Sequence, residues 1–280
     1  MEFMKICGLD YQRLELKSGP LGKTAFAGRL CPPAGTEIQG TLYFLHGGDS
    51  DDRQWIDAKL TERISPIEMS HLIGNGIQIV LPSIGLSFLR GADRSEGSHW
   101  HHFKNEVLTR VERDTNTTDK TRWITGISMG GHGAVNAFLR HPELFAGCGA
   151  HFPGLIDFNP FSDEEAQSYR QRSGITDEHL KVLLYCFRSA FANFEEYRDH
   201  DPIELLKNLR ADELQGRPIY LDVGSKDEFG LQLGAAAFSK ALSEKGVKHV
   251  FEIVEGELHH LPLVQAKISR MLGHILGVCS

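Results

Sequence analysis

The chain has 280 residues, of which 37 are acidic and 30 are basic, for a formal net charge of -7, and 41% of its residues are hydrophobic. This length and composition are sufficient for a full buried core in a single domain, residues 1–280. Charges of both signs are mixed along the chain, which argues against nucleic acid and anionic membranes as partners.

Cysteine usage and the termini suggest a location. The five cysteines form an odd set without a Cys-x-x-Cys pair, a pattern typical of a reducing compartment. The first residues lack the apolar region of a signal peptide, and no stretch reaches the length of a membrane span. We therefore expect a cytoplasmic protein with no membrane partner, and a homo-oligomer stays open.

The pattern of apolar residues predicts an α/β fold. Residues 11–16 and 24–30 are expected to pair as an antiparallel hairpin at the sheet edge. Apolar β runs then alternate with helical stretches, as in a mostly parallel sheet with helices on both faces. The expected strands are 42–45, 77–81, 122–125, 145–151, 219–223 and 249–254, and the expected helices are 105–113, 131–140, 231–245 and 261–276.

One segment departs from this alternation. Residues 157–214 contain no convincing strand and are predicted to form several helices. Because ligands of open α/β sheets bind beyond the carboxyl ends of the strands, this insertion is expected to cap the site and shape its pocket.

The strongest motif is the segment from Gly126 to Gly130, which reads Gly-Ile-Ser-Met-Gly. A predicted strand precedes it and a predicted helix follows it, which is the context of a nucleophile elbow. The two glycines allow the sharp turn that presents the hydroxyl of Ser128. Because a serine hydroxyl is a weak nucleophile, it needs a histidine base and a carboxylate, in the chain order Ser, acid, His.

Two loops supply candidates for the acid and the base. Asp227 follows the strand at 219–223 and is the predicted acid, with Asp222 as the alternative, whereas Glu228 is expected to serve structure or solvation. The loop after the last strand contains His259 and His260. We favour His259 as the base, with His260 as the alternative, because one residue of register is not resolved by sequence.

The oxyanion of a tetrahedral intermediate needs two backbone N–H donors. Met129 follows the nucleophile and supplies the first, and the loop after the strand at 42–45 supplies the second. Gly48 is the expected donor and Gly47 the next choice, with Gly47 also predicted to contact substrate. His46 precedes the serine in the chain and is expected to orient this loop.

Residues 98–103, Ser-His-Trp-His-His-Phe, are rich in imidazole but lack the His-x-x-x-His spacing of a zinc site. They are expected either to line the mouth of the site, with Trp100 or Phe103 contacting substrate, or to pack in the interior. His132 and Cys148 are interpreted as packing residues. No metal or cofactor is predicted.

Four segments together carry a family resemblance: residues 45–48, 80–88, 126–134 and 141–146. They resemble the esterase D-like putative esterase family, and its tributyrin-esterase-like members most of all. The resemblance extends from about residue 24 through the terminal helix. It implies acyl esters or thioesters as substrates and the same roles for Ser128, Asp227 and a histidine at 259 or 260, with the amides of Gly48 and Met129. Members often carry a different sequence after the histidine than this chain does.

We therefore predict a serine carboxylesterase acting on a small ester, short-chain, acetyl-sugar or aryl, through an acyl-enzyme. Two alternatives stay open. One is a thioesterase of the S-formylglutathione hydrolase type or an acyltransferase, because the same acyl-enzyme forms from a thioester and can be resolved by an alcohol. The other is a non-catalytic binding protein on a hydrolase fold.

Overall fold

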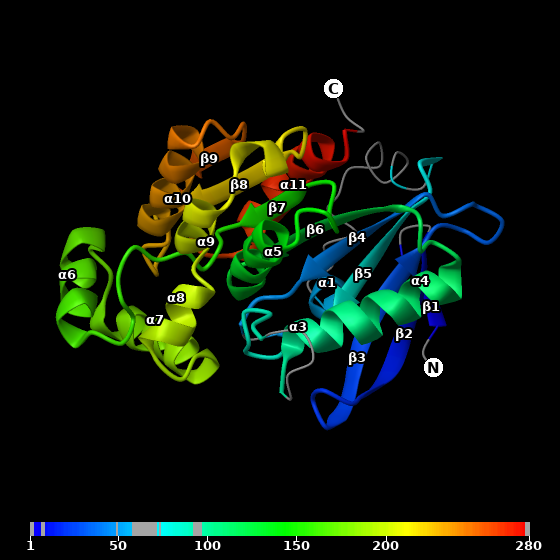
Figure 1. The fold of residues 1–280 in the computed structure, drawn as a ribbon, viewed down its shortest axis with the longest axis horizontal. Coiled ribbons are helices and arrows are strands. Elements are labelled where there is room, and N and C mark those ends of the chain that lie inside the picture. Colours follow the sequence, from blue (N-terminus) through cyan, green and yellow to red (C-terminus); the bar gives the residue numbers. More distant parts are fainter. Residues whose placement is uncertain are drawn as a thin grey trace.

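The computed structural model describes residues 3–6, 9–48, 50–57, 72, 74–91 and 97–277, and it is built around one sheet (Figure 1). The strands are β1 (Phe3–Ile6), β2 (Leu9–Ser18), β3 (Lys23–Cys31), β4 (Gly40–Leu45), β5 (Ile77–Pro82), β6 (Thr121–Ile127), β7 (Cys148–His151), β8 (Ile219–Gly224) and β9 (Val250–Val254). Their order across the sheet is β1-β2-β3-β5-β4-β6-β7-β8-β9.

The sheet is antiparallel at one end and parallel through the rest. Strands β1, β2 and β3 pair antiparallel, and β3 also pairs antiparallel with β5. From β5 through β4, β6, β7 and β8 to β9 every pairing is parallel. The predicted mostly parallel sheet with an antiparallel N-terminal hairpin is confirmed, and β1 adds a further antiparallel strand. The carboxyl ends of the parallel strands therefore share one edge.

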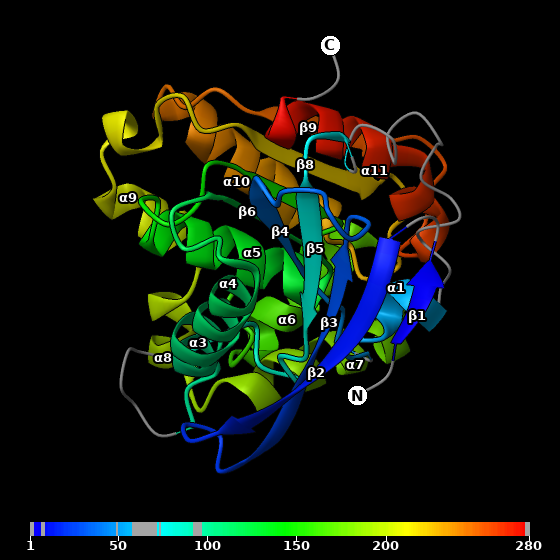
Figure 2. The same ribbon diagram turned by 90° about the vertical axis from the view of Figure 1, so that its right-hand side faces the viewer.

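Helices cover both faces of the sheet. They are α1 (Gln54–Asp57), α3 (His99–His102), η2 (Phe103–Leu108), α4 (Thr109–Thr115), α5 (Met129–Arg140), α6 (Asp163–Ser173), α7 (Asp177–Ala190), α8 (Phe194–Asp199), α9 (Pro202–Asn208), η3 (Ala211–Leu214), α10 (Gln232–Glu244) and α11 (Leu261–Leu276). Helix α5 packs on β6 and β7, and α11 packs on β7 and β8. Figure 2 shows α5 and α11 on opposite sides of the strands. No helix in the described part of the chain is long and apolar enough to span a bilayer.

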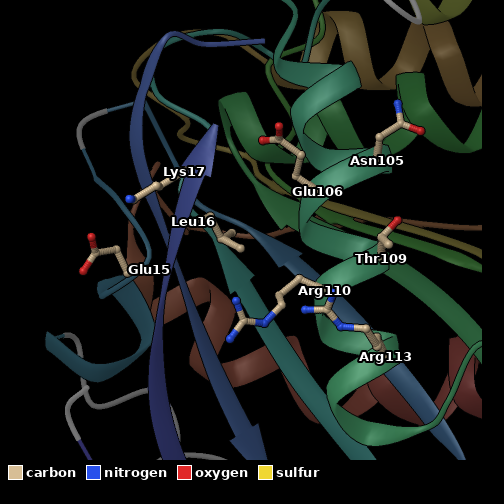
Figure 3. A pocket seen from close by; sticks show the side chains of 8 residues that line it. All are labelled: Glu15, Leu16, Lys17, Asn105, Glu106, Thr109, Arg110 and Arg113. Carbon is tan, nitrogen blue, oxygen red and sulfur yellow. The ribbon is translucent and has the colours of Figure 1, made fainter. Parts of the chain in front are cut away.

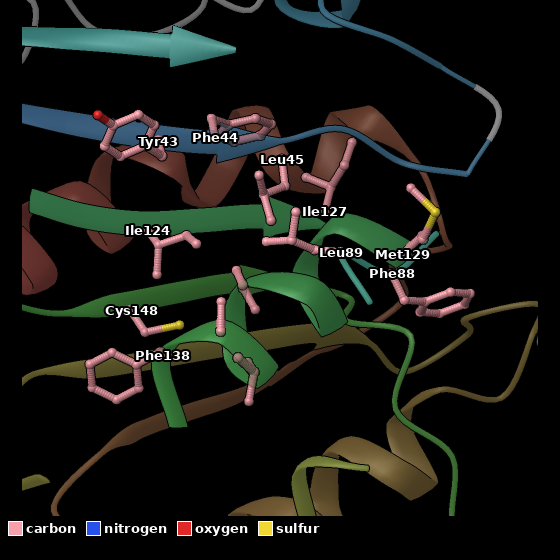
Figure 4. Close-up of a cluster of buried hydrophobic side chains, with 14 of the residues drawn as sticks. Tyr43, Phe44, Leu45, Phe88, Leu89, Ile124, Ile127, Met129, Phe138 and Cys148 are labelled. Atoms are coloured by element: carbon pink, nitrogen blue, oxygen red, sulfur yellow. The ribbon is translucent and has the colours of Figure 1, made fainter. Parts of the chain in front are cut away.

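Alternating strand residues fill the space under α5. Tyr43, Ile124 and Cys148 come from β4, β6 and β7 and are fully buried together with Phe138 of α5 (Figure 4). On the opposite face, the hydroxyl of Thr125 contacts the sulfur of Met271 in α11 at 3.7 Å. Burying a large apolar side chain contributes about 1.5–3 kcal/mol, so this core holds the strand ends firmly in place.

The segment between β7 and β8 forms helices α6 to α9 and η3, which confirms the predicted helical insertion. Each of its α-helices begins at a polar N-cap side chain that accepts a backbone N–H, a standard way to satisfy a helix start. These N-caps are Ser162, Thr176, Asn193 and Asp201. Buried Leu180, Leu183 and Phe187 give α7 its inward face.

The helix predicted at 105–113 begins earlier, because the side chain of Ser98 accepts the N–H of His101 and caps α3. Helical structure then continues through η2 and α4 to Thr115. Cys31, Cys148 and Cys186 carry free thiols, whereas Cys7 and Cys279 lie outside the described residues.

Candidate active site

Ser128 lies at a sharp turn between β6 and α5. Its φ of 52° and ψ of -119° are unusual for a residue with a side chain. A Cβ at Gly126 would overlap the carbonyl of Gly130, and a Cβ at Gly130 would overlap the carbonyl oxygen of Leu45. The two glycines are therefore required on steric grounds, and the turn directs the hydroxyl away from the sheet.

Three backbone hydrogen bonds hold this turn. The N–H of Ser128 donates to the carbonyl of His151 at 3.1 Å. The carbonyl of Ser128 accepts the N–H groups of His132 at 3.0 Å and of Gly154 at 2.8 Å. Strand β7, the loop after it and helix α5 thus fix the strained residue from three directions.

His259 links Ser128 to a carboxylate. The hydroxyl of Ser128 donates to Nε2 of His259 at 2.9 Å, and Nδ1–H of His259 donates to Oδ2 of Asp227 at 2.8 Å. Asp227 follows β8 and His259 follows β9, which are parallel neighbours in the sheet. The arrangement can take the proton of the hydroxyl and stabilise the resulting imidazolium.

The surroundings of Asp227 keep its carboxylate in place. Its side chain is fully buried, and its Oδ1 accepts the N–H groups of Phe229 at 3.0 Å and Leu231 at 3.3 Å. Both oxygens therefore have partners, as a buried carboxylate requires. The ring of His259 packs against Phe152 and Phe229, with centroids 4.4 Å and 4.9 Å away.

The alternative acid and base lie elsewhere. His260 pairs through Nε2 with Glu257 Oε2 at 2.8 Å, so its ring is engaged within its own loop. Asp222 accepts a hydrogen bond from Nδ1–H of His151 at 2.8 Å, and both side chains are fully buried. The structure therefore brings His259 and Asp227 to Ser128.

The loop after β4 is held by His46. Nδ1–H of His46 donates to the carbonyl of Gly47 at 2.7 Å, and its Nε2 accepts the N–H of Ile84 at 2.9 Å. A trans peptide points its C=O and N–H in opposite directions, so the N–H of Gly48 is turned away from His46. The N–H of Gly47 donates to Gln54 at 3.0 Å, which occupies it within the loop.

Met129 is the first residue of α5, so its N–H has no acceptor in its own helix. A Cβ built on Gly48 would lie 4.0 Å from the Cβ of Met129, which shows how closely these residues approach. The positive end of the helix dipole adds to the attraction for an anion here. The N–H groups of Met129 and Gly48 are therefore the candidate donors to a developing oxyanion.

A small apolar cavity of about 60 Å³ opens at Ser128. Helix α7 closes one side of it, the loops after β4 and β6 another, and the loop carrying Asp227 a third. Its lining residues are Gly48, Phe88, Ser128, Met129, Gly154, Val182, Leu183, Cys186, Phe187, Phe229, Leu231 and His259.

The putative esterase family model matches residues 30–271. An acetyl esterase of Caldicellulosiruptor saccharolyticus is 25% identical over 230 residues, which cover 77% of this chain and 76% of that protein. The fold resembles an S-formylglutathione hydrolase from Agrobacterium tumefaciens, with a TM-score of 0.71 at 15% identity, covering 100% and 99% of the two chains. It also resembles a ferulic acid esterase, with a TM-score of 0.70 at 19% identity, covering 96% and 98%.

The family match spans most of the chain, with the Ser128 elbow inside it. The chain belongs to the putative esterase family. It is a serine hydrolase that acts on ester bonds, and its fold is that of the α/β-hydrolases.

The His-rich stretch of this esterase packs in the interior. Trp100 is 5% exposed and stacks on His141 at 4.4 Å, and Phe103 is fully buried against Tyr43 at 5.3 Å. Neither ring lines the cavity at Ser128, and the described residues hold no group of three or more His, Cys, Asp or Glu that could hold a metal ion. The structure thus favours the packing interpretation over contact with substrate.

Two further buried groups of the esterase do not reach the reacting atoms. Burial raises the pKa of the Cys148 thiol under α5. Burial also lowers the pKa of His132 to about 4, and its two nitrogens face the carbonyls of Gly154 at 2.9 Å and His200 at 3.1 Å. His132 therefore links the elbow helix to the helical insertion between β7 and β8.

Several site residues were not predicted from sequence. Phe152 and Phe229 pack on His259, and Leu183, Cys186 and Phe187 line the cavity from α7. The three- and four-residue spacing of apolar positions on α7 indicates an inward face. Nothing in that spacing identifies Ser128 as the neighbour of this face.

A separate surface hollow of about 480 Å³ lies between β2 and the helix formed by η2 and α4 (Figure 3). Its lining residues are Glu15, Leu16, Lys17, Asn105, Glu106, Thr109, Arg110 and Arg113. Glu106 accepts from the N–H of Gly19 at 2.9 Å, and Arg110 pairs with Asp114 at 2.7 Å. None of its lining residues belongs to the cavity at Ser128.

Proposed function

We propose that this esterase hydrolyses small esters of short-chain acids, acetyl foremost, through an acyl-enzyme on Ser128. The observation that carries the proposal is the continuous set of hydrogen bonds from Ser128 through His259 to Asp227. Ser128 and His259 also line a cavity of about 60 Å³. The similarity to an acetyl esterase supports the choice of acyl group.

In the acylation step, Oγ of Ser128 attacks the carbonyl carbon of the ester while Nε2 of His259 takes the hydroxyl proton. The negative charge on the former carbonyl oxygen is stabilised by the N–H groups of Gly48 and Met129. The intermediate collapses, and the leaving alkoxide takes the proton from His259. Asp227 stays ionised throughout and stabilises the imidazolium.

In the deacylation step, a water molecule attacks the acyl carbon and His259 takes one of its protons. The same two amides stabilise the second oxyanion. Collapse breaks the bond to Ser128, whose oxygen recovers the proton from His259, and the carboxylic acid leaves. Each step uses the side chains of Ser128, His259 and Asp227 and the two proposed amides, with water as the co-reactant.

The size of the cavity supports a short acyl chain. A water molecule needs about 10–15 Å³ of such space, so about 60 Å³ admits a few heavy atoms. Phe187 and Leu183 are almost fully buried and close its far side. With p-nitrophenyl esters of increasing chain length, we expect kcat/KM to fall beyond butyrate.

The test of the proposal is Ser128→Ala with p-nitrophenyl acetate as substrate. Loss of the nucleophile should lower kcat by at least about 1000-fold. The wild-type enzyme should be labelled at Ser128 by a fluorophosphonate probe, and mass spectrometry of the labelled peptide identifies the residue.

The matched control is Ser173→Ala, because Ser173 lies in α6 and is absent from the cavity lining. Both variants should give the circular dichroism spectrum of the wild type. Wild-type turnover by Ser128→Ala, or probe attachment at another residue, would contradict the assignment.

A further inference from the structure

Two consecutive carboxylates contact His259. Asp227 accepts Nδ1–H of its ring, and Glu228 accepts its backbone N–H through Oε2 at 2.6 Å. The sequence suggested only structure or solvation for Glu228, because its side chain extends from the loop one residue beyond the acid. The structure instead places this carboxylate on the residue that carries the imidazole.

We propose that Glu228 is a positioning residue for esterolysis, which holds the backbone of His259 so that the ring meets both Ser128 and Asp227. The inference rests on the proposed role of His259 as the base. Glu228 contacts the base only through its main chain, so its contribution acts through His259.

The loop that carries His259 needs such an anchor. Its first half is tied to the neighbouring loop, since Ser225 N–H donates to the carbonyl of Val254 at 2.9 Å and Lys226 N–H to that of Glu257 at 2.9 Å. The N–H of Gly256 also donates to the hydroxyl of Ser225, at 2.9 Å. These bonds fix the segment up to residue 257 and leave the three residues before the helix, 258–260, to other contacts.

The second half of the loop contains His259 itself. The N–H of His260 bonds locally to the carbonyl of Leu258 at 3.0 Å, which shapes the turn without linking it to another element. The bond from the N–H of His259 to Glu228 therefore joins this half to the loop after β8, at the residue whose ring must be aimed.

The ring has little freedom to compensate for a shift of its backbone. Its Nδ1 and Nε2 are 2.8 Å and 2.9 Å from Asp227 and Ser128, and Phe152 and Phe229 pack against it. A displacement of about 1 Å at the main chain would lengthen both hydrogen bonds, and misplacements of that size can cost about 100-fold in rate.

Three substitutions separate the position of the acceptor from its charge. Glu228→Ala removes the acceptor. Glu228→Asp keeps the charge but retracts the acceptor by one methylene group, whereas Glu228→Gln keeps the reach and an acceptor oxygen without the charge. We expect Ala and Asp to lower kcat for p-nitrophenyl acetate by about 10- to 100-fold, and Gln to stay within about threefold of the wild type.

Because the cavity walls are unchanged, KM should stay within about twofold in all three variants. The control is Glu257→Ala. Glu257 lies in the loop that carries His259, but its carboxylate pairs with the side chain of His260. It should keep wild-type kcat.

Three outcomes would each overturn the inference. They are wild-type kcat in Glu228→Asp, a kcat in Glu228→Gln as low as in Glu228→Asp, and an equal loss of kcat in Glu257→Ala. The Asp and Gln pair decides even where Glu228→Ala does not fold. Failure of the proposed function is separate, because it appears as turnover by Ser128→Ala. An inactive Ser128→Ala beside a fully active Glu228→Asp would overturn the role of Glu228 alone.

Discussion

At the scale of single residues, Ser128 holds a backbone conformation that the surrounding bonds must maintain. Its φ of 52° and ψ of -119° lie in a sparsely populated region, which costs about 1–3 kcal/mol for a residue with a side chain. The hydrogen bonds to His151, His132 and Gly154 offset that cost. Any change that moves the turn should therefore affect both stability and reactivity.

Gly130→Ala should disrupt this turn. Its Cβ would overlap the carbonyl oxygens of Leu45 and His46, which belong to β4 and the loop carrying Gly48. Overpacking against backbone leaves no flexible side chain to move aside, so we expect a loss of about 3 kcal/mol or more in the free energy of unfolding. Urea unfolding measures the loss, and fluorophosphonate labelling of Ser128 should slow in parallel.

Gly74→Ala is the matched control, because a Cβ at Gly74 would meet no atom of the described residues within 4 Å. It should change stability by less than about 0.5 kcal/mol and leave labelling unchanged. Wild-type stability in Gly130→Ala would show that the elbow tolerates a side chain, against the steric argument.

The proposed catalytic residues differ in how well the sequence predicts them. Ser128 is marked by local pattern alone, since two glycines, a strand and a helix surround it. His259 and His260 are adjacent in a loop, and only the three-dimensional course of that loop decides which ring meets Ser128. The structure turns His260 to Glu257, a contact within the same turn that sequence spacing does not reveal.

At the scale of elements, helix α7 determines the depth of the cavity. Leu183 and Phe187 lie one turn apart and face Ser128, and both are almost fully buried. Tyr185 lies between them in sequence and is 66% exposed. The helix therefore presents a closing face to the cavity and a free face to solvent.

Leu183→Ala should lengthen the acyl chain that the enzyme accepts. Removing this side chain extends the cavity toward α7, so the ratio of kcat/KM for octanoate to that for acetate should rise about tenfold. The same change should lower the free energy of unfolding by about 2–5 kcal/mol, because a large buried side chain is lost. Rates for a series of p-nitrophenyl esters measure the ratio.

Tyr185→Ala provides the control on the same helix. Its side chain is exposed and absent from the cavity lining, so the preference for chain length should not move. An unchanged preference in Leu183→Ala would mean that the acyl chain occupies another part of the site.

The elements were predictable to the extent that local patterns define them. The strands of the parallel sheet are short apolar runs, and the helices of the insertion have polar N-caps such as Ser162 and Thr176. The packing of α7 over Ser128 and of Trp100 against His141 depends on tertiary contacts between segments far apart in the chain. Periodicity indicates which face of a helix is buried but not its partner.

At the scale of the whole molecule, parallel pairing gathers the site. Leu45 pairs with Gly126, and Ile127 pairs with His151, so the loops that follow these strands meet at one edge. Strands β8 and β9 add Asp227 and His259 at the same edge. The helical insertion then joins this edge at His132 of α5, whose Nε2 lies 3.1 Å from the carbonyl of His200.

The buried imidazole of His132 should make the free energy of unfolding sensitive to acid. Burial lowers the pKa of His132 to about 4 from an ordinary value of 6.5. The unfolded chain therefore binds a proton between these pH values that the folded chain does not, so stability is full above pH 6.5 and is lost as the pH falls toward 4. The contribution of His132 is about 3 kcal/mol over this window.

Burial raises the pKa of Asp201 to about 6, so this carboxyl adds stability as the pH falls and opposes the effect of His132. The test therefore compares two proteins rather than two pH values alone. Between pH 7 and pH 4.5, the free energy of unfolding in urea should fall by about 2 kcal/mol more for the wild type than for His132→Gln. His260→Gln, which alters a pair whose side chains are 37% and 34% exposed, should follow the wild type. An equal fall in wild type and His132→Gln would show that another group governs acid stability.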